Sequence, residues 1–132
     1  MNPSLVDSVP LFSGIARRHH GEVAALADVV EVPAGAVLTR EGELAREAFV
    51  VIDGSAEVHV GGVRVSTLGR GSLFGELGLV AGPRRTATVG ARSAMQLLVL
   101  GPRELASLMH RFPSVRDRVG AAAAVHLSGS AT

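Results

Sequence analysis

The residues best suited to chemistry lie in one stretch, residues 74–89, which reads FGELGLVAGPRRTATV. Its one acid, Glu76, stands near the beginning, and two arginines, Arg84 and Arg85, stand near the end, with almost nothing polar between them. The apolar middle is expected to be buried, so the carboxylate and the guanidinium groups should face one another across a small gap. That gap holds either a plain salt bridge or a ligand.

These residue types favour one kind of ligand. A helix that begins at Gly75 and Glu76 would present unpaired backbone N–H groups at its first turn, which form a natural anion site. An arginine from the returning strand would complete that site with a charge-assisted hydrogen bond. Glu76 would repel phosphate but accept hydrogen bonds from sugar hydroxyls. A phosphate fused to a sugar satisfies both demands, and a salt bridge between Glu76 and Arg84 or Arg85 explains the same residues equally well.

The five histidines raise the alternative of a metal site. His59 has no second histidine two residues away and no glutamate at the downstream spacing of a cupin metal site. His19 and His20 form an adjacent pair in an expected loop, so these histidines are expected to be solvated and no metal is expected. No nucleophile, base and orienting group converge in the sequence, which does not indicate an enzyme.

Composition narrows the class of protein further. The 132 residues suit a single domain with its own core, and the absence of cysteine excludes disulfides and thiolate chemistry. All 13 basic residues are arginine, which is typical of a GC-rich genome; they are scattered among 12 acids, so nucleic-acid binding is not expected. We find neither a signal-peptide pattern nor an apolar run long enough for a membrane segment, and the expected location is the cytoplasm.

The secondary structure predicted for the elements that position residues 74–89 changes along the chain from helix to strand. Residues 1–30 have helical spacing, for example at Val23, Leu26 and Val30, whereas residues from 31 onward form short β-prone runs cut by glycine. Short strands separated by glycines are typical of a β-sandwich or small barrel.

One β-hairpin and two helices stand out. The segment AEVHVGGVRVS predicts a hairpin with a two-glycine turn that pairs Val60 with Val63 and Val58 with Val65, which would put all four valines on one face. After a buried strand at residues 94–100, a helix begins near Gly101-Pro102. Its apolar stripe consists of Leu105, Leu108, Met109 and Phe112. A last helix over residues 113–127 has a stripe of mostly small residues: Val115, Val119, Ala122, Ala123 and His126.

The stretch 74–89 resembles the phosphate-binding cassette of the cyclic nucleotide-binding domain family. FGELGL, the eight-residue gap between Glu76 and Arg85, and RTATV all match that cassette. The segments PLFSGI, PAGAVLTREGE, VVIDGSAEV and LGRGSLFGELGL also follow the family's order. One departure is Arg84, because proline is the commoner neighbour of the phosphate arginine and here Pro83 stands one place earlier.

The resemblance implies a role for each cassette residue. Glu76 should accept a hydrogen bond from the ribose 2′-hydroxyl, and Arg85 should hold the cyclic phosphate. Thr86 should lie beside the phosphate and the base, where it permits cyclic GMP without requiring it. Arg84 should point to solvent or pair with a nearby acid. The complete set of expected ligand-binding residues is Phe74, Gly75, Glu76, Leu77, Gly78, Arg85, Thr86 and Ala87.

The implied architecture is mainly β with flanking α: a β-jelly-roll (double-stranded β-helix) with N-terminal helices, a short cassette helix and two C-terminal helices. We expect residues 1–30 to be an N-terminal helical segment of the same domain. Residues 31–127 would form the cyclic nucleotide-binding β-roll with its lid helices, and residues 128–132 a flexible tail.

The implied function is regulatory binding of a cyclic purine nucleotide, cAMP or cGMP, with no other cofactor, by a bacterial signalling protein. The ligand would draw the terminal helices over its base, with Val119, Ala123 and His126 as candidate lid contacts, and would switch an effector protein or domain. A homodimer is compatible with this function. One alternative is a structural or interaction module that kept the fold and lost the ligand, and a cupin-like metal enzyme is a more remote one.

Overall fold

A computed structural model describes residues 1–80 and 82–127 of the chain. The strands are β1 (Asp28–Val32), β2 (Val37–Thr39), β3 (Ala48–Asp53), β4 (Ala56–Val60), β5 (Val63–Leu68), β6 (Leu73–Phe74), β7 (Thr88–Ala91) and β8 (Met95–Leu100). The α-helices are α1 (His20–Ala25), α2 (Leu77–Val80), α3 (Pro102–Arg111) and α4 (Pro113–Leu127). The 3-10 helices are η1 (Pro3–Ser8), η2 (Pro10–Phe12) and η3 (Arg17–His19). The predicted flexible tail, residues 128–132, lies outside the described residues.

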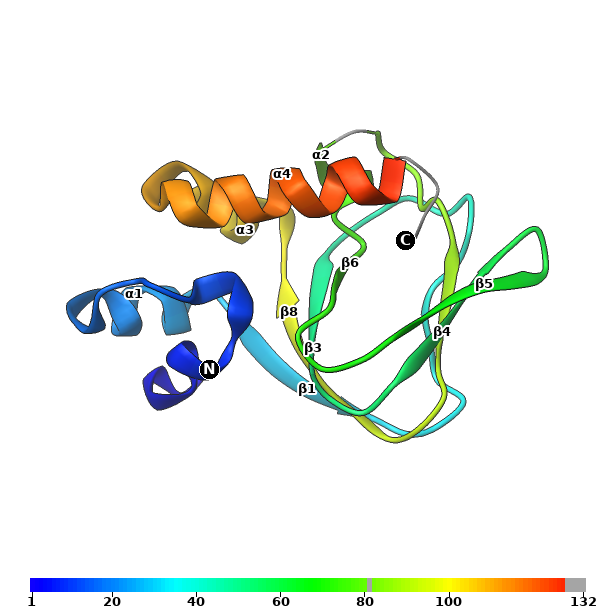
Figure 1. Cartoon of the computed structure of the whole chain (residues 1–132), viewed down its shortest axis with the longest axis horizontal. Coiled ribbons are helices and arrows are strands. Elements are labelled where there is room, and N and C mark those ends of the chain that lie inside the picture. The colour runs from blue at the N-terminus through cyan, green and yellow to red at the C-terminus, as the bar shows by residue number, and fades with distance from the viewer. Residues whose placement is uncertain (81, 128–132) are drawn as a thin grey trace.

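The strands form two antiparallel sheets of four strands each, in the orders β1-β8-β3-β6 and β2-β7-β4-β5. Figure 1 shows the sheets wrapped into a roll, with the N-terminal segment at one side and the β4–β5 hairpin projecting from the other, while α4 runs along the top from the side of the N-terminal segment to α2. The predicted mainly β jelly roll with flanking helices is confirmed.

Strand β8 separates two groups of buried residues. Leu97 packs inside the roll with Phe49, Val58 and Val89, which come from both sheets. The next residue, Leu98, faces the other way and packs with residues of the N-terminal segment, α3 and α4. Because successive side chains of a strand point to opposite faces, β8 joins the core of the roll to the helical layer.

The N-terminal segment is helical for less of its length than predicted. Three short 3-10 helices precede α1, and β1 begins at Asp28, so the helical prediction for residues 28–30 is wrong. Val29 and Val30 pair instead with Leu98 and Leu97 of β8. Valine is β-branched and favours a strand, so pairing with a buried neighbour outweighs the local helical spacing.

The β4–β5 hairpin has a different register from the predicted one. Val60 does pair with Val63 across the turn, but Val58 pairs with Ser66 because the register shifts between Val58 and His59. Val65 is the extra residue of this irregularity, as in a β-bulge. The four valines therefore do not share one buried face: Val58 is buried, whereas Val60, Val63 and Val65 are exposed.

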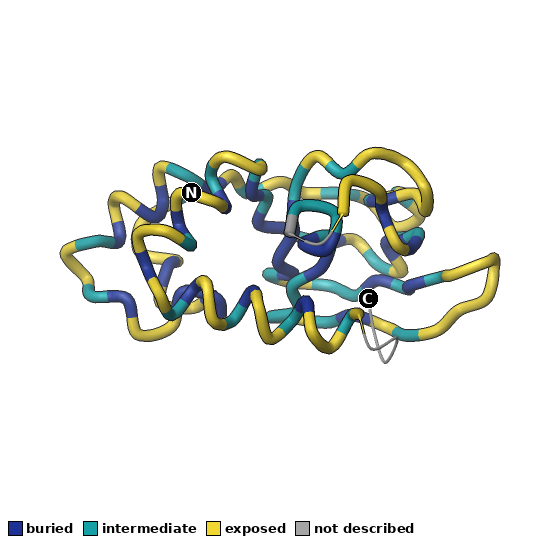
Figure 2. The backbone as a smooth tube through the Cα atoms, turned by 90° about the horizontal axis from the view of Figure 1, so that it is seen from above, coloured by how far each residue is buried: buried dark blue, intermediate teal, exposed yellow. Residues whose placement is uncertain are grey.

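The two closing helices follow the prediction closely. In α3, Leu105 and Leu108 are buried, and Phe112 directly follows the helix and is also buried. In α4, the buried residues Val115, Val119 and Ala123 recur at intervals of four. Figure 2 shows the resulting alternation of buried and exposed positions along this helix. Only one narrow face of α4 therefore packs against the rest of the molecule.

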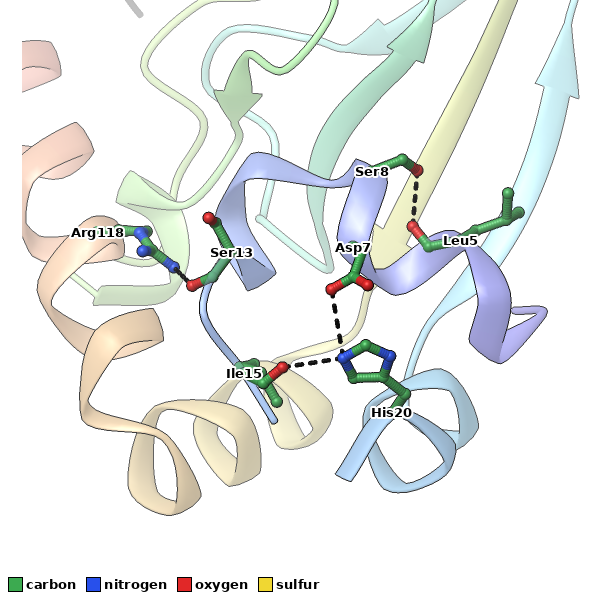
Figure 3. A network of polar contacts seen from close by, with 7 residues as sticks. All are labelled: Leu5, Asp7, Ser8, Ser13, Ile15, His20 and Arg118. Carbon is green, nitrogen blue, oxygen red and sulfur yellow. Dashed lines mark hydrogen bonds and ion pairs between the residues drawn. The ribbon is translucent and has the colours of Figure 1, made fainter. Parts of the chain in front are cut away.

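Polar contacts join the N-terminal segment to α4 (Figure 3). Arg118 Nη1 donates hydrogen bonds to the carbonyl oxygens of Leu11 at 3.1 Å and Ser13 at 2.6 Å. Elsewhere in the segment, His20 is buried, contrary to the prediction that it is solvated. Its Nε2 donates to the Ile15 carbonyl oxygen at 2.9 Å and lies 3.5 Å from Asp7 Oδ1, which replaces the lost water.

Candidate functional site

The backbone of the cassette is closely packed at two glycines. Gly75 has a φ of +81°, and a Cβ placed there would lie 2.7 Å from Arg85 Nη1 and 3.1 Å from the Glu47 carbonyl oxygen. A Cβ on Gly78 would collide with Cβ of Ala45. Glycine is therefore required at residue 75 by both conformation and space, and at residue 78 by space.

The returning segment is fixed by the loop that precedes β3. The Arg85 N–H donates to the Glu43 carbonyl oxygen at 2.7 Å, and the Arg85 carbonyl accepts from Gly42 N–H at 2.9 Å. Arg84 is exposed and its Nη1 donates to the Gly42 carbonyl oxygen at 2.9 Å. Of the two outcomes expected for Arg84, exposure is found, but its recorded partner is a backbone carbonyl and not an acid.

Arg85 points the other way and is buried, with 7% of its surface exposed. Its Nη1 donates to the Gly75 carbonyl oxygen at 2.9 Å, and its guanidinium lies over the Phe49 ring, 5.8 Å from the centroid. Burial lowers the pKa of Arg85 from its ordinary value, and the nearby carboxylates of Glu47 and Glu76 oppose that shift. The positive charge is thus held in a fixed place at the edge of the roll.

Glu76 is completely buried, and only one of its carboxylate oxygens has a partner. His126 Nδ1 of α4 donates a hydrogen bond to Oε1, while Oε2 has no hydrogen-bond partner in the described part of the chain. A buried carboxylate oxygen without a donor is costly and is seldom retained without a reason. The salt-bridge alternative is wrong for this structure, because the ion pair of Glu76 is made with His126 rather than with either arginine.

These groups surround a small cavity between the cassette and the end of α4. All eight predicted ligand-binding residues line it, together with His126. Its volume is about 20 Å³, which leaves room for a single water molecule. The other two candidate lid residues, Val119 and Ala123, are buried in the packing of α4 and do not line the cavity.

Two lining residues were not predicted, Thr39 and Val89. They are partners in the pairing of β2 with β7, and Thr39 Oγ1 donates to the Ala87 carbonyl oxygen at 3.0 Å and accepts from Val89 N–H at 3.2 Å. Nothing in the short run around Thr39 marks it out, because its place depends on a strand that lies 50 residues away.

Two further structural findings bear on the class of site. Within residues 1–80 and 82–127, no group of three or more histidine, aspartate and glutamate side chains is arranged to hold a metal ion. None of the helices described is long and apolar enough to cross a membrane.

Known proteins share both the sequence and the fold. The family model of the cyclic nucleotide-binding domain matches residues 29–112. A cyclic nucleotide-gated potassium channel of Rhizobium etli is 34% identical over an alignment of 124 residues, and the match covers 89% of this chain and 33% of the channel. The cAMP-dependent protein kinase regulatory subunit of Schizosaccharomyces pombe is 34% identical over 95 residues, 71% of this chain and 23% of the subunit.

The catabolite activator protein of Thermus thermophilus has a crystal structure that matches this one with a TM-score of 0.78 and 28% sequence identity. The match covers 92% of this chain and 59% of that chain. All three relatives are therefore much longer than the part that this chain matches. The chain belongs to the cyclic nucleotide-binding domain family.

Proposed function

We propose that the cavity between the cassette and α4 binds a cyclic purine nucleotide, cAMP or cGMP, and that binding regulates a partner without catalysis. The observation that carries this proposal is the buried Glu76 carboxylate, with one oxygen unpartnered, lining the same cavity as the buried Arg85 guanidinium. A ligand with a hydroxyl and an anionic group side by side meets the needs of both residues.

Arg85 is proposed to hold the cyclic phosphate. Its Nη1 donates a hydrogen bond to the Gly75 carbonyl oxygen, and this bond fixes the guanidinium at the wall of the cavity. A guanidinium has five N–H donors, so others remain for a phosphate. Backbone N–H groups near Leu77 and Gly78, at the start of α2, would complete the cradle. The four-residue α2 is too short to attract an anion by itself, so the arginine is the principal source of affinity for phosphate.

Glu76 is proposed to accept a hydrogen bond from the ribose 2′-hydroxyl. A carboxylate can only accept, so a hydroxyl donor suits the unpartnered Oε2, whereas a phosphate oxygen does not. Thr86 is exposed and lines the cavity, where its hydroxyl is proposed to lie beside the base and to permit cGMP as well as cAMP.

The terminal helix α4 is proposed to carry the signal. It contacts α2 and β6 at one end and η2 at the other, so it touches both the cassette and the N-terminal segment. Two of the three relatives named above are a channel and a kinase regulatory subunit, and this supports an effector domain or protein as the receiver of the signal. A cytoplasmic location remains part of this proposal.

One observation favours a second candidate function. The cavity of about 20 Å³ is nearly filled by the chain itself, as expected of a module that kept the fold and no longer takes a ligand. The two candidates differ in whether any cyclic nucleotide binds at all.

Calorimetric titration of the protein with cAMP and with cGMP separates these candidates. We expect saturable binding of at least one nucleotide with a dissociation constant in the micromolar range or below, and no binding of 5′-AMP at the same concentrations, because its phosphate is not fused into a ring with the sugar. Absence of binding up to millimolar cAMP and cGMP would establish the ligand-free module.

The regulatory part of the proposal is tested by hydrogen exchange on the same samples. Saturating nucleotide should increase amide protection at residues 75–78 and alter it within residues 113–127. A change confined to the cassette would mean that the ligand is held without any response of α4.

A further inference from the structure

The proposed ligand site contains a side chain of the protein itself. His126, on the last turn of α4, donates from Nδ1 to Glu76 Oε1, and the two side chains are 8% and 0% exposed. Glu76 is the residue proposed to accept the ribose hydroxyl, and the remaining cavity is about the size of one water molecule. A nucleotide that bonds to Glu76 needs more room than this cavity offers while His126 keeps its place.

The last turn of α4 packs less extensively on the rest of the protein than its first turns do. Near its start, Val115 and Val119 are both completely buried, and Arg118 donates two hydrogen bonds to the N-terminal segment. Near its end, Ala123 is the last buried residue, and Leu127 is 65% exposed. The last turn therefore buries little apolar surface, and His126 of this turn pairs with Glu76 of the cassette.

Two charged side chains line the cavity beside His126. The imidazole meets the Glu76 carboxylate directly, and Arg85 lines the same cavity from the returning segment. His126 thus bonds to Oε1 of Glu76 and lines the cavity into which a ligand bound to Oε2 would have to fit, while Arg85 keeps its bond with Gly75.

We infer that His126 is a tethered competitor of the cyclic nucleotide: its side chain occupies the cavity beside Glu76 in the free protein and must leave before the ligand can bind. This inference rests on the proposed function. A binding-competent state that is populated in only about one molecule in ten raises the apparent dissociation constant about tenfold. Removing the imidazole should therefore tighten binding, which is the opposite of what loss of an ordinary ligand contact would do.

The test is a titration of three proteins with cAMP and cGMP: wild type, His126→Ala and His110→Ala. His110 is exposed on α3 and does not line the cavity, so its variant controls for the loss of an imidazole from a helix. We expect His126→Ala to bind about tenfold more tightly than wild type, and His110→Ala to bind within twofold of wild type. Equal or weaker binding by His126→Ala overturns the inference, because His126 would then be neutral or a contact that holds the ligand.

Two further results are possible: neither protein binds a nucleotide, or the His126→Ala variant does not fold. If neither wild type nor folded His126→Ala binds cAMP or cGMP at millimolar concentration, the proposed function fails, and this result is distinct from failure of the competitor alone. If His126→Ala does not fold, the side-chain nitrogen resonances of wild type, assigned with His126→Gln, decide instead. Saturating nucleotide should move the His126 signals toward those of exposed His110, and unchanged His126 signals in a saturated protein would overturn the inference.

Discussion

The carbonyl oxygen of Gly75 accepts a hydrogen bond from Arg85 Nη1 at 2.9 Å, which ties the beginning of the cassette to the arginine ten residues later. A side chain at residue 75 would meet that same nitrogen, so this position of the arginine requires glycine at residue 75. The bond uses a backbone acceptor, and it therefore aims the guanidinium without neutralising its charge. Arg85 therefore lines the cavity as a cation.

Replacing Arg85 with alanine should weaken binding of cAMP and cGMP at least tenfold, because it removes the side-chain cation proposed for the phosphate. Arg84→Ala is the matched control, since Arg84 is the adjacent arginine but is exposed and bonded to the Gly42 carbonyl. Calorimetry should find Arg84→Ala within about threefold of wild type. The reverse order of the two variants would place the phosphate contact one residue earlier.

Thr86→Ala should weaken cGMP more than cAMP. The guanine base carries an exocyclic amino group that the threonine hydroxyl can accept from, and adenine offers no such group at that position. The selectivity is read as the ratio of the two dissociation constants for wild type and variant, so each protein serves as its own control. Equal losses for both nucleotides would assign the hydroxyl to the phosphate alone.

Gly78→Ala should lower the free energy of unfolding by about 1 to 3 kcal/mol, although alanine favours a helix, because its Cβ would collide with Ala45. Gly82 has open space around it, so Gly82→Ala should change the free energy of unfolding by less than about 0.5 kcal/mol. Urea denaturation measures both. The double variant Gly78→Ala, Ala45→Gly should recover most of the loss, and failure to do so would show that the collision is not its cause.

Arg118→Ala should lower the free energy of unfolding by about 1 to 2 kcal/mol, because Leu11 and Ser13 lose a charged donor and the side chain is only partly exposed. Arg116→Ala, on the same helix, removes only an exposed ion pair with the adjacent Asp117 and should cost less than about 0.5 kcal/mol. Thermal or urea denaturation compares the pair. Equal losses would mean that the bonds to the N-terminal segment do not hold α4.

Much of the fold could be predicted from local patterns. Proline at the first position of α3 and of α4, with buried residues at intervals of three and four, placed both closing helices correctly. The cassette could be located because its glycines, Glu76 and Arg85 are required at fixed spacings, and the structure does bring all eight predicted residues to one cavity. Their roles as ligand contacts remain predictions for the titrations to test.

Both errors arise where the pairing of strands overrides the local pattern of valines. The valines at the start of β1 fit a helical repeat, but pairing with β8 decides their conformation. The valines of the β4–β5 hairpin fit a regular register, but a one-residue irregularity beyond the turn moves Val58 opposite Ser66. The β8 partner of β1 lies far along the chain, and the irregularity of the hairpin does not interrupt its alternating valines, so spacing alone cannot choose between the outcomes.

The sequence by itself determined which residues are the candidates for the chemistry, because a carboxylate and a guanidinium cannot be exchanged for other types without losing their charge. Only the tertiary structure decided what these residues contact in the free protein. Glu76 and His126 lie 50 residues apart, and their meeting depends on where α4 docks. The buried Val115 and Val119 and the bonds of Arg118 set that position, and through it His126 reaches the one carboxylate that the ligand is proposed to need.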